Sequence, residues 1–176
     1  MRKIICILAS LVLPLLCIAQ NRGGIALLDK AAGQRVTFNY VYSLDQGKGM
    51  NEVTKGSVTV EGNCFVVSGL GMKSYSDGAN LWMVDEKSKE VVIDAVSADD
   101  VFSNPALLIS SYRNYLDQIK VNREGADSLD ITITLDEGTK ARFKLSSVSF
   151  SEPEGADGFS FQVTSLPSEW VVTDLR

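Results

Sequence analysis

Side chains that usually carry catalytic chemistry are scarce in this chain. Its 176 residues include no histidine, which removes the usual general base, the Ser-His-Asp arrangement and the commonest zinc ligand together. Of three cysteines, Cys6 and Cys17 lie in an expected leader segment, so Cys64 has no partner for a disulfide within one mature chain. We therefore expect no metal, no cofactor and no enzymatic activity.

Carboxylates are the remaining candidates for acid-base or ion chemistry. The chain has 22 Asp and Glu against 17 Lys and Arg, and paired carboxylates can hydrolyse glycosides. Most of them stand at turns, as in Glu61-Gly62, where turn chemistry explains them. The acids at 152, 154 and 157 do not have the spacing of a calcium loop. The acidic balance and the lack of clustered Lys and Arg argue against nucleic acid as a partner.

Large apolar side chains recur on one face of the expected strands, and this is the feature that could bind a ligand. They are Phe38, Tyr40, Tyr42, Phe65, Phe143 and Phe161. Such a set can fill the core of a sandwich or line an apolar cavity, and the residues alone leave both possibilities open.

Short alternating segments must position these side chains. The pattern predicts a helix over residues 23–34, then strands joined by acidic-glycine turns into an antiparallel meander. The expected strands cover residues 36–44, 53–60, 64–68, 81–84, 90–95, 119–123, 129–135, 141–150 and 159–164. A phase change within residues 141–150 predicts a β-bulge near Ser146-Ser147.

One apolar segment, residues 97–117, breaks the β pattern. We interpret it as two short helices, the first capped by Ser97 and the second starting at Pro105. Helices with this much apolar surface must cover something, either an ordinary core or a cavity.

The N-terminus predicts export. Arg2 and Lys3 precede an uncharged run, and small side chains at Cys17 and Ala19 suit a cleavage site near Ala19. The run falls short of the roughly 20 residues that span a bilayer. We expect a signal peptide over residues 1–19 and a single monomeric domain over residues 20–176.

Three segments, in order, resemble the outer-membrane lipoprotein carrier (LolA-like) family. Ser76-Asp77-Gly78-Ala79-Asn80-Leu81-Trp82 resembles the family's turn-plus-tryptophan signature. Ser103-Asn104-Pro105-Ala106-Leu107-Leu108-Ile109 looks like its helical segment. Phe161-Gln162-Val163-Thr164-Ser165-Leu166-Pro167, followed by Val171-Val172-Thr173-Asp174-Leu175-Arg176, looks like its C-terminus.

The resemblance implies a mainly β (α+β) fold, a strongly curved, unclosed antiparallel β-barrel with an N-terminal helix and a helical lid. It also implies a periplasmic carrier of lipoprotein acyl chains, which receives them from an inner-membrane lipoprotein-releasing transporter and gives them to an acceptor at the outer membrane. On this reading Trp82 joins the six aromatic residues above in lining the cavity. The lid residues are Phe102, Pro105, Leu107, Leu108 and Tyr112.

One departure and two alternatives accompany the resemblance. The better-studied members of the family carry a basic residue just before the strand that begins here near Cys64, whereas this chain has Glu61-Gly62-Asn63. The first alternative is a lipid-sensing envelope-stress module of the same fold. The second is a carbohydrate-binding β-sandwich, which predicts that Trp82 and Trp170 lie side by side and exposed.

Overall fold

The computed structural model describes residues 25–97, 104–136 and 138–176. The expected signal peptide lies outside these residues, as do Phe102 and all but the capping Ser97 of the first helix expected in the segment 97–117. No helix in the described part of the chain is long and apolar enough to cross a bilayer.

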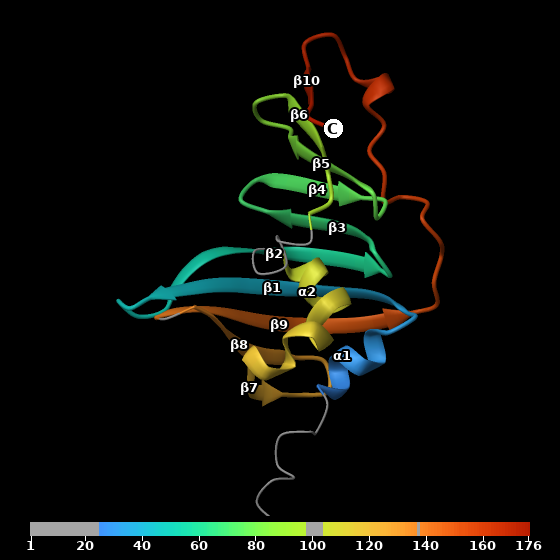
Figure 1. The fold of residues 1–176 in the computed structure, drawn as a ribbon. Coiled ribbons are helices and arrows are strands. Elements are labelled where there is room, and N and C mark those ends of the chain that lie inside the picture. Colours follow the sequence, from blue (N-terminus) through green and yellow to red (C-terminus); the bar gives the residue numbers. More distant parts are fainter. Residues whose placement is uncertain (1–24, 98–103, 137) are drawn as a thin grey trace, which may run out of the picture.

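Ten strands of the described residues form one open sheet, in the order β10-β6-β5-β4-β3-β2-β1-β9-β8-β7 (Figure 1). This confirms the expected mainly β fold with an unclosed sheet and few helices. All pairs are antiparallel except β10 with β6, which is parallel. The strands are β1 Arg35–Gln46, β2 Asn51–Glu61, β3 Cys64–Gly69, β4 Met72–Ser76, β5 Asn80–Asp85, β6 Glu90–Ala95, β7 Ile119–Glu124, β8 Leu129–Asp136, β9 Thr139–Ser151 and β10 Val171–Asp174.

Two short helices lie against the sheet near β1 and β9 (Figure 1). α1 (Ala26–Ala31) is shorter than expected, and Gly33, at φ +76°, takes the left-handed conformation that follows many helix ends. α2 (Pro105–Ser111) starts at the predicted proline, and the side chain of Asn104 accepts a hydrogen bond from the Ala106 N–H at 2.9 Å. A 3-10 segment, η2 (Tyr112–Gln118), follows directly.

The predicted bulge in β9 is confirmed. Thr37 pairs with Ser149 and Asn39 pairs with Ser146, so two residues of β9 stand opposite Phe38. Ser147, at φ +54°, absorbs the extra residue. Phe150, which pairs with Val36, thereby returns to the face that carries Leu145 and Phe143.

Both faces of the sheet are covered, over different strands. The helix face carries the side chains of Val36, Phe38 and Tyr40 and lies beneath α1 and α2. Residues 152–170 run from β9 to β10 (Figure 1) and pack on the opposite face, against the cluster that contains Trp82. We call that face the strap face and this segment the strap.

Glu61 fixes the near end of the strap. Its carboxylate accepts hydrogen bonds from the N–H groups of Glu154 at 3.0 Å and Gly155 at 2.8 Å. Arg35 donates to Glu154 at 2.8 Å and lies over the ring of Phe159, which is 1% exposed. Glu61 therefore binds the strap, on the face of the sheet opposite the helices.

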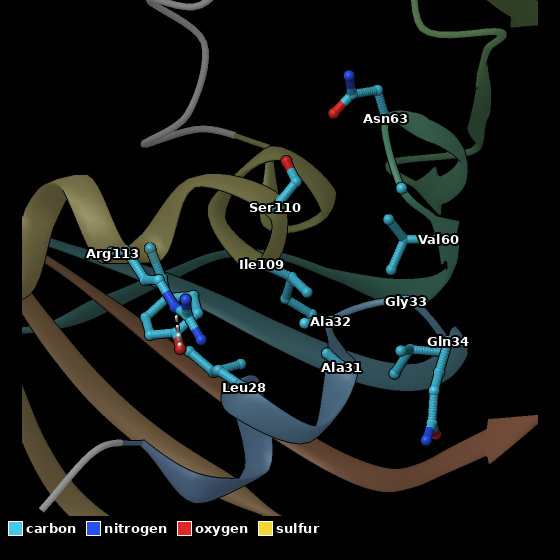
Figure 2. Close-up of a pocket in the computed structure, with 13 residues that line it drawn as sticks. Leu28, Ala31, Ala32, Gly33, Gln34, Val60, Asn63, Ile109, Ser110 and Arg113 are labelled. Carbon is cyan, nitrogen blue, oxygen red and sulfur yellow. Dashed lines mark hydrogen bonds between the residues drawn. The ribbon is translucent and has the colours of Figure 1, made fainter.

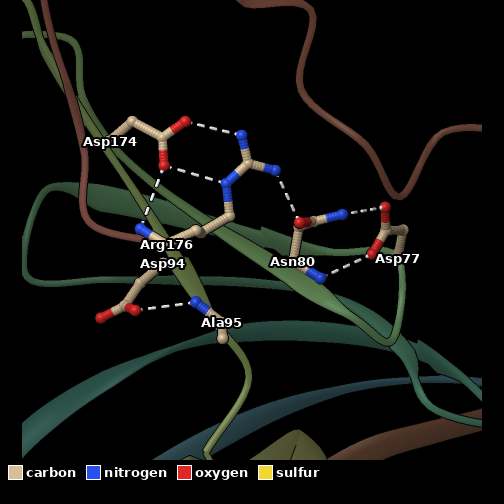
Figure 3. Close-up of polar contacts among 6 residues, drawn as sticks. All are labelled: Asp77, Asn80, Asp94, Ala95, Asp174 and Arg176. Atoms are coloured by element: carbon tan, nitrogen blue, oxygen red, sulfur yellow. Dashed lines mark hydrogen bonds and ion pairs between the residues drawn. The ribbon is translucent and has the colours of Figure 1, made fainter.

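Strand β10 and the C-terminal Arg176 fix the far end (Figure 3). The guanidinium donates two hydrogen bonds to the Asp174 carboxylate, at 2.9 and 2.6 Å, and one to Asn80 on β5 at 2.7 Å. Asn80 in turn donates to Asp77 at 3.0 Å. These hydrogen bonds from Arg176 lower the pKa of Asp174 to about 2.

The strand expected over residues 159–164 is wrong. Phe159, Phe161 and Val163 alternate with exposed residues because the extended strap lies flat on the sheet, and an extended chain on a surface buries every second side chain. It pairs with no strand among the described residues, and a 3-10 turn, η3 (Val163–Ser165), interrupts it. Strand β4 and the parallel pairing of β10 were not predicted.

Candidate functional site

A cavity of about 250 Å³ lies between α1, α2 and the ends of β1 and β2 (Figure 2). Its floor is the apolar helix face, and the turn between β2 and β3 forms part of its wall. The lining residues are Leu28, Ala31, Ala32, Gly33, Gln34, Val36, Val60, Gly62, Asn63, Ile109, Ser110, Tyr112 and Arg113. The cavity is smaller than the 300–1,000 Å³ or so of pockets that enclose drug-sized ligands.

Five of the seven residues predicted to line a cavity converge beneath the helices. They are Phe38, Tyr40, Tyr42, Phe65 and Phe143, none more than 7% exposed. The rings of Tyr42 and Phe143 lie 4.9 Å apart. Burial raises the pKa values of both Tyr40 and Tyr42, so their hydroxyls stay neutral. In this closed arrangement the five side chains form a packed core.

The other two, Trp82 and Phe161, lie elsewhere. Trp82 pairs with Tyr75 and Ile93 across neighbouring strands, and paired residues share a face. That face is the strap face, where Trp82 belongs to a separate apolar cluster and the ring of Phe161 lies 5.4 Å from that of Tyr75. The prediction that both join the other five in one cavity is therefore wrong, because Trp82 points away from the helices and Phe161 belongs to the strap.

The same cluster bears on the carbohydrate alternative. Trp82 and Trp170 are both part of it, but Trp82 is only 8% exposed. The exposed aromatic platform that a sugar-binding surface requires is not formed by this pair.

The described lid residues close the helix face. Pro105, Leu108 and Tyr112 are buried, and Leu107 is partly buried against the same core. Leu108 is only 1% exposed, so the lid side chains occupy the space over the sheet.

A polar contact ties the lid to α1. The Tyr112 hydroxyl donates a hydrogen bond to the carboxylate of Asp29, and the Arg113 guanidinium donates to the same carboxylate at 2.9 Å. The hydrogen bond from Tyr112 has the largest effect on the pKa of Asp29, and together with that from Arg113 it holds this pKa below its usual value. Burial raises the pKa of Tyr112. We call this contact the latch; Asp29 and Arg113 were not predicted, since nothing in the sequence indicates that positions 83 and 84 residues apart meet.

Beyond the helices the helix face stays apolar and becomes accessible. Cross-strand pairs form a row from Val67 on β3 through Ser74 and Met83 to Val92 on β6. Val67, Met83 and Val92 are partly exposed. This row, which we call the open row, continues the floor of the core past the part that α1 and α2 cover.

Among the described residues, no group of three or more His, Cys, Asp or Glu side chains could hold a metal ion. Cys64 is a free thiol at the start of β3. Partial burial, with the nearby charges of Asp77 and Glu61, raises its pKa and so keeps it protonated.

Comparison with known proteins gives no family. No protein-family model matches the chain, and no curated protein matches it. Among solved structures, an uncharacterized conserved protein from Thermus thermophilus aligns with 85% of this chain and 96% of its own, at 9% sequence identity and a TM-score of 0.44.

Proposed function

We propose that this protein is a periplasmic carrier of lipoprotein acyl chains, which moves them from the inner to the outer membrane as LolA-like carriers do. The observation that carries the proposal is the continuous apolar helix face. One part is closed by a lid of small helices, and the other, the open row, is accessible at Val67, Met83 and Val92.

The energetics of acyl binding suit this face. Burying a dozen methylene groups at about 0.8 kcal/mol each contributes on the order of 10 kcal/mol. Such a chain needs more room than the closed cavity of about 250 Å³ provides. Binding therefore requires that α2 move away from the sheet, after which Leu108 and Tyr112 give up their places to the ligand.

A closed empty state also assists release. When cargo leaves, the lid side chains return to the sheet and remove their own apolar surface from water, so the empty carrier is not left with a vacant apolar cavity. The free energy gained by that closure offsets part of the free energy of acyl binding. A carrier of this kind binds firmly enough for transit and loosely enough for hand-over.

Binding of a palmitoylated lipopeptide to the purified protein tests the proposal. We expect Met83→Glu to weaken binding strongly, because it places a charge in the open row. The matched control, Val172→Glu, puts the same charge at an exposed position of β10 and is expected to leave binding unchanged. No lipopeptide binding by the unaltered protein, or equal binding by Met83→Glu at unchanged thermal stability, would overturn the proposal.

Depletion in cells tests the transport step. If the protein carries lipoproteins, its loss leaves them at the inner membrane, and Met83→Glu fails to restore delivery. Normal delivery after depletion would leave acyl binding in place and refute carriage.

A further inference from the structure

The part of the strap face that the strap does not cover carries a cluster of positive charge. Lys120 and Arg123 lie on β7, Arg142 and Lys144 on β9, and Lys55 on β2; we call these five residues the basic patch. They come from three separate segments of the sequence, which is why no cluster of Lys and Arg is visible there.

The strand register places all five on one face. Lys120 pairs with Thr132, which pairs with Arg142. In the next row Arg123 pairs with Asp130, and Asp130 with Lys144. That second row runs on through Val41, which pairs with Lys144 on one side and Lys55 on the other.

Spacing follows from the register. Cations in a row stand on alternate strands, which places them about 10 Å apart. The two rows together extend over β7, β8, β9, β1 and β2.

The charge of the basic patch is largely uncompensated. Asp130 lies within it and is held by Arg142 through two hydrogen bonds, at 2.8 and 2.6 Å. Two further acids stand at the edge of the patch on the same face: Glu52, which pairs with Ser43 at the far end of the Lys120 row, and Asp45, which pairs with Lys140 in the next row. Lys55, Lys120, Arg123 and Lys144 are exposed and form no ion pair with any other described residue. The local charge of the patch is therefore positive, although the formal charge of the whole chain is −5.

From this layout we propose that the basic patch is a docking surface for a protein partner that presents a cluster of carboxylates. Complementary charge speeds encounter and fixes the orientation of two proteins. The patch lies on the face opposite α1 and α2, so a partner bound there leaves the lid free to move.

A membrane surface fits the patch less well than an acidic protein. The side chains between the cations are Thr132, Asp130 and Val41, so the patch offers little apolar surface. Stable attachment to a bilayer takes an apolar or lipid anchor besides a basic cluster. An anionic bilayer also repels the rest of this acidic molecule, whereas a partner protein needs to match only the patch.

Binding to a fluorescein-labelled peptide of alternating glutamate and serine, followed by fluorescence anisotropy, tests the proposal. We expect binding that weakens with added salt, and a loss of at least about tenfold in affinity for the triple variant Lys120→Glu, Arg123→Glu, Lys144→Glu. The matched control reverses three exposed lysines elsewhere, Lys48→Glu, Lys73→Glu and Lys87→Glu, with the same change in net charge.

Two results would overturn it. One is equal weakening by both triple variants, which would mean that only net charge matters. The other is salt-sensitive binding to phosphatidylcholine vesicles containing phosphatidylglycerol, lost in the patch variant, together with no peptide binding. The inference rests on charge layout alone, so its failure leaves acyl binding untouched, and lipopeptide binding by the patch variant separates the two.

Discussion

Replacing Tyr112 by Phe tests the latch, because it removes one hydroxyl and keeps the ring that packs in the core. The hydroxyl donates to the Asp29 carboxylate, and a hydrogen bond to a charged group contributes roughly 1.5–3 kcal/mol. The Asp29 side chain is 44% exposed, so water can take the place of the hydroxyl once the ring lacks it. We therefore expect the closed lid to lose only about 1 kcal/mol relative to the open one.

That loss has a measurable effect on ligand binding. About 1 kcal/mol shifts a two-state equilibrium roughly fivefold, and when only the open state binds, the apparent affinity rises by up to the same factor. Titration and stopped-flow mixing with an environment-sensitive palmitoyl probe measure the affinity and the association rate. Both are expected to increase in Tyr112→Phe.

The control is a variant that loses similar stability away from the lid. Ile93 on β6 is 4% exposed and belongs to the apolar cluster of the strap face, and Ile93→Val is expected to cost about 0.5–1.5 kcal/mol of unfolding free energy. It should leave probe binding unchanged. If Tyr112→Phe lowered the melting temperature but bound the probe as the unaltered protein does, the latch would be a contact of the fold that does not restrain the lid.

Three further predictions concern the latch, the bulge and the strap. Because folding lowers the pKa of Asp29, the latch is complete above the ordinary carboxyl pKa of about 3.9 and is lost as the pH falls through the pKa of the folded protein. The affinity for the palmitoyl probe should therefore rise on acidification. Asp29→Asn should abolish that rise. Ser147→Gly relieves a positive φ and should raise the unfolding free energy by about 1 kcal/mol in urea, whereas Ser146→Gly should lower it by about 0.5–1 kcal/mol. Glu61→Gln weakens the acceptor for the Gly155 N–H and should speed proteolysis of the strap. Equal cleavage rates in the variant and the unaltered protein would show that other contacts hold the strap.

The strands and the bulge could be predicted because their signals are local. Alternation from Val36 to Leu44 requires an extended chain, and the phase change between Leu145 and Phe150 requires an extra residue. The start of the second helix was equally local, since Pro105 is a residue typical of a first helical turn.

The role of residues 159–164 could not be predicted in the same way. An extended segment buries every second side chain whether it pairs as a strand or lies across a sheet. Phe159 and Phe161 therefore give the same pattern in both cases. The latch depends on how α1 and η2 pack together, and the basic patch depends on strand register. Asp29 therefore meets Tyr112, and Lys144 joins Arg123 on one face, only once the chain has folded.

The family resemblance leaves open how a lid would be held at Glu61-Gly62-Asn63, where the better-studied LolA-like carriers have a basic residue. Glu61 faces the strap, while Gly62 and Asn63 line the cavity beside the lid without contributing a charge. The charged contact to the lid comes instead from α1, with the acid at Asp29 and the base at Arg113. Loss of the Asp29 contacts should shift the lid towards an open state, whatever stands at positions 61–63. If the protein is a carrier, opening of the latch should favour cargo binding and its re-formation should favour release, and substitutions in the turn between β2 and β3 should affect cargo transfer much less than Tyr112→Phe does.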